Sequence, residues 1–314
     1  MDLSAKIGNL KIDPAIMNAS GIFSSLNVLE RISKYDFGAL VTKSIGIGPR
    51  EGFMEPVLAQ ATEETYVNAV GLSNPGYELV REELEKIYPL PKPLICSIFG
   101  SSEEELVEVA TGLEKCCDAI ELNFSCPNLK KGERHGIVIG RDPELVKKYT
   151  EAVRENIRKP IIVKLTPNVY DIGKVAKAAE EAEADAVAAI NTVYPAMKID
   201  IYAKKPVLTA KFGGLSGRGI KPIGVAAVYS IYENVGIPII GIGGITIAED
   251  VLEYIEAGAD AVGIGTAFIG KNTKQVGNYL KQLRMDLKKL LQDERIKVSS
   301  LRELKGVAHV LQTS

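Results

Sequence analysis

The sequence predicts an α/β protein of the (β/α)8 TIM barrel class, with an N-terminal hairpin and an insertion over the barrel mouth. Eight short apolar segments of strand length recur along the 314 residues, and amphipathic stretches separate most of them. The phrases Ala184-Asp-Ala-Val187 and Ala259-Asp-Ala-Val262 repeat each other, with a looser copy at 117–120, where a helix should end and a strand begin. A repeated unit, eight strands and this length favour a barrel, with a doubly wound sheet as the alternative.

The elements can be placed in chain order. Residues 3–12 alternate weakly around Gly8-Asn9, which indicates a hairpin. The strand candidates are 16–19, 39–42, 94–99, 119–123, 161–165, 186–191, 238–242 and 261–265, and the helix candidates are 103–115, 143–157, 172–182, 222–235 and 248–257. Residues 46–90 are rich in Gly and Pro, so they are expected to run over the barrel mouth. Because no linker divides the chain, residues 1–314 are interpreted as one domain.

Composition excludes several classes of function. Lys and Arg number 38 against 40 Asp and Glu, which is not the basic excess of a nucleic-acid-binding protein. No apolar run approaches the roughly 18 residues of a membrane span, and the first residues lack the apolar core of a signal peptide. The four cysteines have no C-x-x-C spacing, so no metal site is expected in this chain. We therefore expect a cytoplasmic protein with free thiols.

The strand candidate 119–123 ends in a run of reactive groups, Glu121-Leu-Asn-Phe-Ser-Cys-Pro-Asn128. This run offers two amides, a hydroxyl and a thiol, and Pro127 ends the strand. Residues 129–142 carry three glycines among charged residues, which predicts a mobile flap. Reactive groups at a strand end under a flap are typical of an α/β active site. The alternative is an ordinary buried thiol beside turn asparagines.

The other strand ends fit an active site at the barrel mouth, where this fold places its chemistry. All eight carry polar, cationic or glycine residues, among them Lys43, Lys164, Asn191 and the pairs Gly243-Gly244 and Gly265-Thr266. The two neighbouring glycine turns predict phosphate binding, unless these glycines only permit tight turns. Two lysines at strand ends suggest contacts with an anion, such as a reduced flavin.

Two other nucleotide motifs are not expected. Gly265 to Asn272 nearly spells a phosphate-binding P-loop, but Asn272 replaces the hydroxyl residue that binds Mg²⁺. No G-x-G-x-x-G follows an early strand, which argues against a Rossmann dinucleotide site.

Taken in order, these phrases make the chain resemble the soluble, class 1 dihydroorotate dehydrogenases. The matching phrases are Asn18–Gly21, Val41–Ser44, Asn68–Asn74, Glu121–Asn128, Val163–Asn168, Ile190–Thr192, Gly213–Gly217, Gly241–Gly244 and Gly265–Thr266. The resemblance covers residues 18–266 and implies an FMN-containing barrel that oxidises (S)-dihydroorotate to orotate in pyrimidine synthesis.

The resemblance also implies residue roles. Cys126 would be the base that removes the C5 proton while a hydride leaves C6 for the flavin. Substrate would bind to Lys43, Asn68, Gly71, Leu72, Asn74, Asn123, Asn128, Asn191 and Thr192. FMN would bind to Ser20, Lys43, Ser44, Ser97, Asn123, Lys164, Ile190, Gly217, Gly243, Gly244, Gly265 and Thr266. Amides suit dihydroorotate because its ring alternates C=O and N–H groups. Ser97 is a departure, since many relatives carry Asn there.

Alternatives concern the substrate and the electron acceptor. The phrase Lys131–His135 also resembles the reductases of free pyrimidine bases, but Asn128 stands where those reductases typically have His. A flavin-binding barrel without turnover is a further alternative, against which Cys126 argues.

The acceptor is expected to be NAD⁺. The membrane-bound quinone class has an extra N-terminal amphipathic segment and a serine base. This chain begins almost directly at its first hairpin and has Cys126 in place of the serine, so that class is not expected. A glycine-bearing flap leading into Asp142-Pro-Glu144 resembles the NAD⁺ form, class 1B, more than the fumarate-reducing homodimer. That form implies a homodimer or a heterotetramer with a partner subunit that carries FAD and a 2Fe–2S cluster.

Overall fold

Eight parallel strands form the barrel in the computed structural model, which describes residues 1–127 and 136–310. The strands are β3 (Ile16–Asn18), β4 (Leu40–Val41), β9 (Leu94–Ile98), β10 (Ala119–Asn123), β11 (Ile161–Lys164), β12 (Ala186–Ala189), β17 (Ile239–Ile242) and β18 (Ala261–Ile264). They pair in the order β3-β18-β17-β12-β11-β10-β9-β4. A parallel bridge between Met17 and Ala39 joins the two ends. The predicted barrel and its eight strands are confirmed, and closure excludes the doubly wound sheet.

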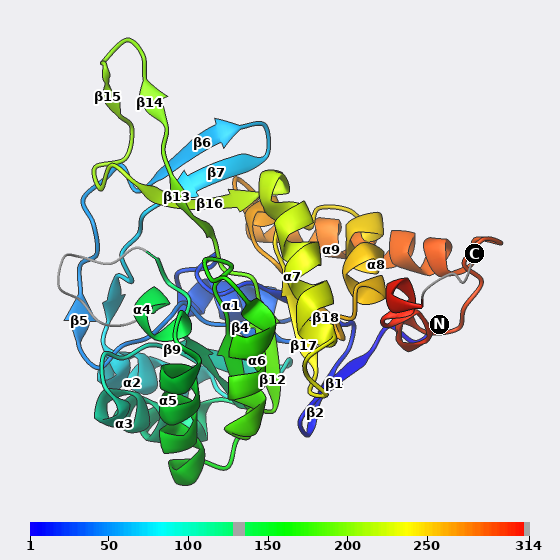
Figure 1. The fold of residues 1–314 in the computed structure, drawn as a ribbon, viewed down its shortest axis with the longest axis horizontal. Coiled ribbons are helices and arrows are strands. Elements are labelled where there is room, and N and C mark those ends of the chain that lie inside the picture. Colours follow the sequence, from blue (N-terminus) through cyan, green and yellow to red (C-terminus); the bar gives the residue numbers. More distant parts are fainter. Residues whose placement is uncertain (128–135, 311–314) are drawn as a thin grey trace.

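A helix follows each barrel strand. These helices are α1 (Leu26–Ile32), α2 (Tyr77–Ile87), α3 (Glu103–Leu113), α5 (Pro143–Asn156), α6 (Ile172–Glu181), α7 (Lys221–Tyr232), α8 (Ala248–Glu256) and α9 (Thr273–Leu291). Each packs against the next and α9 returns to α1, so the helices ring the sheet (Figure 1). Ser102, Asp142 and Asp171 cap α3, α5 and α6 by accepting first-turn N–H groups. Five helices match the predicted ranges, whereas α1, α2 and α9 were not predicted.

The barrel is closed at its lower end by the predicted hairpin, which is confirmed as β1 (Ala5–Ile7) and β2 (Leu10–Ile12). Gly8 turns the hairpin with φ +55°, and its backbone lies against Pro160 and Asp185. Asp2 forms a bridge with Ser300, so the two terminal segments lie side by side at the end opposite the mouth (Figure 1).

Two excursions cover the barrel mouth. The first carries β5 (Pro49–Arg50), β6 (Leu58–Thr62), β7 (Thr65–Asn68) and β8 (Asn74–Pro75), and the second carries β13 (Val193–Ala196), β14 (Ile199–Asp200), β15 (Lys205–Pro206) and β16 (Gly213–Gly217). Strands β13, β16, β7 and β6 pair into a four-stranded antiparallel sheet, here called the roof sheet, from which the β14–β15 hairpin projects (Figure 1). The predicted insertion is present, although its last part is α2, and the second excursion was not predicted.

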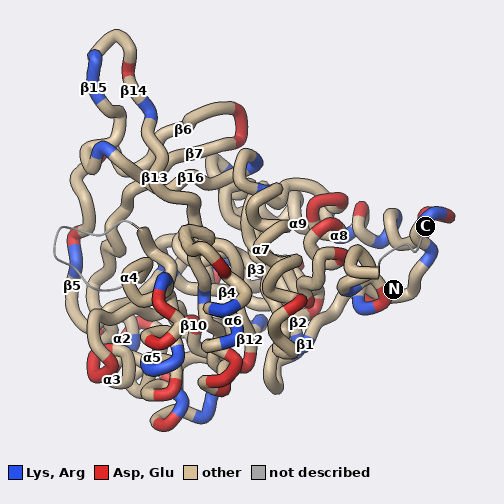
Figure 2. Tube along the Cα trace, in the orientation of Figure 1, with Lys and Arg blue, Asp and Glu red and all other residues tan. Residues whose placement is uncertain are grey.

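Both signs of charge occur on the outer helices. Lys and Arg are interspersed with Asp and Glu along α2 and α5, whereas the charged residues of α3 are all Glu (Figure 2). Across residues 1–127 and 136–310, every helix is too short or too polar to cross a membrane.

Candidate active site

A cavity of about 410 Å³ lies where the barrel strands end and the roof sheet begins. Its volume is within the range of small-molecule and cofactor sites. Most of the predicted site residues line it: Ser20, Lys43, Ser44, Asn68, Gly71, Leu72, Asn123, Cys126, Lys164, Ile190, Asn191, Thr192, Gly217, Gly243, Gly244, Gly265 and Thr266. The structure therefore brings together residues that are up to 246 positions apart in the sequence.

Three predicted site residues stand apart from this set. Ser97 is fully buried and its hydroxyl contacts Ser44 Oγ at 3.0 Å, so it supports the cavity from one layer below. Asn74 accepts the N–H groups of Gly46 and Gly76 and donates to Leu72 O, which leaves it a turn residue of the first excursion. Asn128 lies outside the described residues.

A chain of hydrogen bonds fixes the amides at the end of β10. Asn123 donates to Ser44 Oγ at 2.8 Å and accepts the Ser125 hydroxyl at 2.8 Å. Ser125 in turn accepts Asn191 Nδ2 at 2.8 Å, and Asn191 Oδ1 accepts the backbone N–H of Thr192. Each amide nitrogen keeps a second N–H for a ligand. The side chains are thus oriented by the protein before any ligand binds.

Cys126 lies in the cavity wall next to this network. It is 8% exposed and packs with Leu72 and Phe99. Its carbonyl accepts the N–H of Ile137 at 2.9 Å, at the start of α4 (Ile137–Gly140). A Cβ on Gly136, which has φ +57°, would lie 2.6 Å from that carbonyl oxygen. The described part of the predicted flap is therefore a short helix packed against Cys126, and the rest lies outside the described residues.

Two lysines supply positive charge at different depths. Lys164 ends β11 directly beside Asn123 and is 4% exposed, yet it lines the cavity. Lys43 is half-buried and donates to Ser73 Oγ at 2.7 Å. Burial lowers the pKa of Lys43, because the charged form loses hydration. An anionic ligand in the cavity would stabilise both charged ammonium groups.

Glycines form the opposite end of the cavity. Gly217, Gly243 and Gly244 have positive φ values of 94°, 133° and 69°. Among the described residues, the N–H groups of Gly244, Gly265 and Thr266 have no acceptor. A Cβ on Gly244 would lie 2.9 Å from Gly217 O and 2.8 Å from Lys221 Cβ. Close-packed backbone with unpaired N–H donors is the chemistry that a phosphate requires.

Thr192 has a polar atom without a partner. Its hydroxyl is buried at the cavity and has no hydrogen-bond partner among the described residues. Buried polar atoms in native proteins are nearly always paired, so an unpaired hydroxyl at a cavity suits a ligand atom. Gly214 makes this position possible, because a Cβ there would lie 2.0 Å from Thr192 Oγ1.

Sequence reasoning missed part of the wall. The missed lining residues are mostly apolar: Ala19, Gly21, Ile22, Val57, Leu58, Val70, Pro127, Ser216, Ile220, Ile242 and Ile269. Some of these residues lay inside motifs already quoted: Ala19, Gly21, Val70, Pro127, Ser216 and Ile242. An isolated isoleucine such as Ile22 or Ile269 carries no signal that separates a cavity wall from the core. Within the described part of the chain, no cluster of three or more His, Cys, Asp or Glu could hold a metal ion.

Comparison with known proteins agrees with the resemblance found in the sequence. A family model described as dihydroorotate dehydrogenase matches residues 2–287. A protein of Pyrococcus furiosus named dihydroorotate dehydrogenase B (NAD(+)), catalytic subunit, is 44% identical over 98% of this chain and 99% of its own. Proteins of the same name from Thermoplasma acidophilum and Methanocaldococcus jannaschii are 42% and 40% identical, each over 98% of this chain.

The fold has solved counterparts. A crystal structure of the dihydroorotate dehydrogenase of Eimeria tenella in complex with ferulenol superposes with a TM-score of 0.81. It covers 98% of this chain and 89% of its own at 21% sequence identity, a likeness that concerns the fold alone.

Proposed function

The chain belongs to the dihydroorotate dehydrogenase family of flavin-dependent oxidoreductases, and we propose that it oxidises (S)-dihydroorotate to orotate in pyrimidine biosynthesis with FMN as its flavin. The observation that carries this proposal is that one cavity holds a thiol, oriented amides, two lysines and a glycine cradle. We place the reaction in the cytoplasm.

FMN fits the two ends of this cavity. Its phosphate suits the cradle of Gly217, Gly243, Gly244, Gly265 and Thr266. Among the described residues, the N–H groups of Gly244, Gly265 and Thr266 have no acceptor, and a side chain on Gly217 or Gly244 would clash. Ser20, Ser44 and Ile190 would line the flavin, and Lys164 would hold its ring from β11. When bound, FMN supplies the acceptor for the hydride from substrate C6.

The protein's own side chains would remove the proton and bind the substrate. Cys126 would take the proton from C5 as the hydride leaves C6, so that the C5=C6 double bond forms and the charges balance. Asn68, Asn123, Asn191 and the unpaired Thr192 hydroxyl would bind the pyrimidine ring and its carboxylate. Lys43, half-buried between the strand ends and the roof sheet, would attract the same carboxylate.

Anaerobic bleaching of the flavin tests this function. Dihydroorotate should bleach the yellow protein, whereas dihydrouracil, which lacks the carboxylate, should bleach it far more slowly. Equal bleaching by both compounds would instead favour a reductase of free pyrimidine bases.

We further propose that electrons reach NAD⁺ through a partner subunit with FAD and a 2Fe–2S cluster. The name of the Pyrococcus furiosus relative, a catalytic subunit of an NAD⁺ enzyme, supports this acceptor. The isolated chain should reduce an artificial dye but not NAD⁺, and it should gain NAD⁺ reduction when the partner is added. Brisk reduction of fumarate by the isolated chain would contradict this assignment.

We also propose that the chain forms a homodimer, on which the partner subunits complete a heterotetramer. Apolar side chains are exposed on and beside the β14–β15 hairpin, among them Ile199, Ile201 and Tyr202, the last of which is 91% exposed. Clusters of this kind mark protein interfaces. Light scattering should give twice the chain mass, and Ile201→Asp should shift the mass toward a monomer. A monomeric wild-type protein would rule out the homodimer.

A further inference from the structure

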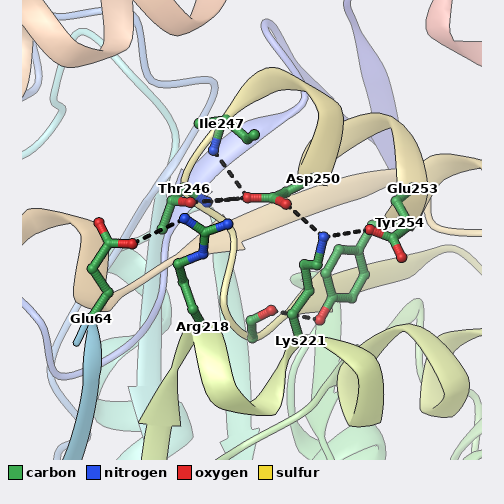
Figure 3. A network of polar contacts seen from close by, with 9 residues as sticks. Glu64, Arg218, Lys221, Thr246, Ile247, Asp250, Glu253 and Tyr254 are labelled. Atoms are coloured by element: carbon green, nitrogen blue, oxygen red, sulfur yellow. Dashed lines mark hydrogen bonds and ion pairs between the residues drawn. The ribbon is translucent and has the colours of Figure 1, made fainter. Parts of the chain in front are cut away.

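Side chains from two helices hold the turn that follows β17, residues 243–247 (Figure 3). This turn begins with Gly243 and Gly244, which line the cavity, and ends at the start of α8. The residues that hold it are Lys221 on α7 and Asp250, Glu253 and Tyr254 on α8. None of these four side chains lines the cavity itself.

Tyr254 anchors the first peptide of the turn. It is fully buried, and its hydroxyl donates to Gly243 O at 2.7 Å. Two glycines make room for it: a Cβ on Gly241 would lie 2.4 Å from the ring, and a Cβ on Gly224 would lie 1.9 Å from the hydroxyl oxygen. Burial raises the pKa of Tyr254 well above its usual range, so the phenol stays a neutral donor.

The orientation of the next N–H follows from this anchor. In a trans peptide the C=O of one residue and the N–H of the next point in opposite directions. The hydroxyl of Tyr254 fixes the Gly243 C=O on the helix side of the turn. The Gly244 N–H, which has no acceptor among the described residues, must then face the cavity.

The rest of the turn is fixed separately. Asp250 accepts the N–H groups of Thr246 at 2.8 Å and Ile247 at 3.1 Å, as well as the Thr246 hydroxyl. Lys221 Nζ contacts Asp250 at 2.7 Å and Glu253 at 2.6 Å, so the buried carboxylate is neutralised near the cavity (Figure 3). These bonds occupy the N–H groups of Thr246 and Ile247, and the Gly244 N–H is left available to a ligand.

We propose that Tyr254 is a positioning residue for phosphate binding: through the Gly243 carbonyl it aims the Gly244 N–H at the phosphate of the flavin. The proposal rests on the proposed function, because the ligand it concerns is FMN. It predicts that loss of the Tyr254 hydroxyl weakens only the binding of the flavin's phosphate group. A flavin without a phosphate should bind equally well with or without the tyrosine hydroxyl.

Tyr254→Phe tests this inference in protein freed of flavin and titrated with FMN or with riboflavin. The FMN dissociation constant should rise about tenfold, because the Gly244 N–H would no longer be held toward the phosphate and one hydrogen bond to an anion would weaken. The riboflavin constant should not change. Tyr88→Phe is the matched control, because the Tyr88 hydroxyl also donates a hydrogen bond, to Asp118 Oδ1, but Tyr88 does not line the cavity.

A second variant displaces the hydroxyl without removing it. Gly224→Ala puts a methyl group where the Tyr254 hydroxyl lies, so it should weaken FMN and spare riboflavin in the same way. Equal losses of both flavins, or an unchanged FMN constant in Tyr254→Phe, would overturn the inference. If the wild-type protein binds neither flavin, the proposed function fails instead.

Discussion

Replacing Cys126 by serine is expected to leave FMN bound while slowing its reduction by dihydroorotate by about 10² or more, the usual effect of losing a general base. An unperturbed thiol has a pKa of about 8.5, so a few per cent is thiolate at neutral pH, and a serine hydroxyl ionises far less. A serine side chain is no larger than that of cysteine, so it fits where Cys126 packs with Leu72 and Phe99. Anaerobic stopped-flow absorbance measures the rate.

The matched control is Cys116→Ser. Cys116 is also a buried free thiol, but it does not line the cavity. The flavin of the Cys116→Ser protein should bleach at the wild-type rate even if the protein becomes less stable. A Cys126→Ser protein that bleaches as fast as the wild type would remove Cys126 from the mechanism.

Replacing Lys164 by alanine is expected to weaken FMN binding about 10- to 100-fold, the range for losing a charge-assisted hydrogen bond in a buried site. Any flavin that stays bound should have a lower reduction potential, because an ammonium near N1 stabilises the reduced, anionic ring. Lys164 suits this role since it is 4% exposed and still lines the cavity. Flavin titration and redox titration against a reference dye measure the two effects.

Lys147→Ala serves as the control for Lys164. Lys147 is a surface residue that pairs with Glu181 at 3.2 Å, and exposed pairs of this kind contribute little. The Lys147→Ala substitution should change neither the affinity for FMN nor the reduction potential of the flavin. Unchanged values in Lys164→Ala as well would show that the lysine does not act on the flavin.

The barrel could be predicted because its strands are buried on both faces. Such strands read as apolar runs, as in residues 161–163, and five of them are followed by a helix that its apolar periodicity predicted. α9 is the longest helix among the described residues and was not predicted, although Val276, Leu280, Leu283 and Leu287 recur along it with helical spacing. α1 has only seven residues, too few to show a period.

The roof sheet was only half predictable. Its strands come from two distant excursions, and β16, Gly213–Gly217, is mostly glycine with no alternation to reveal a strand. The pairing of β16 with β7 supplies the missing information: Gly214 lies opposite Asn68 and Gly217 opposite Thr65. Glycine-rich strands are set by their partners, which a sequence pattern does not display.

The candidate site was predictable where polar residues end strands. Lys164 and Asn123 stand out because a polar group closes an apolar run, and register then places them side by side. Tyr254 could not be found this way. Its tyrosine ring belongs to the apolar face of α8, and only the three-dimensional fold shows that its hydroxyl reaches Gly243 O.

The pairing of β7 with β16 also bears on the order of folding. Contacts between these strands join residues 146 to 152 positions apart, whereas the β6–β7 hairpin and the βα units of the barrel are local. Closing a loop of that length costs chain entropy before any contact repays it, so local units form first. The cavity needs Asn68 from one strand and Gly217 from the other. The binding site is therefore completed only after the barrel beneath it has formed, so a folding chain becomes able to bind its ligands later than it acquires the barrel.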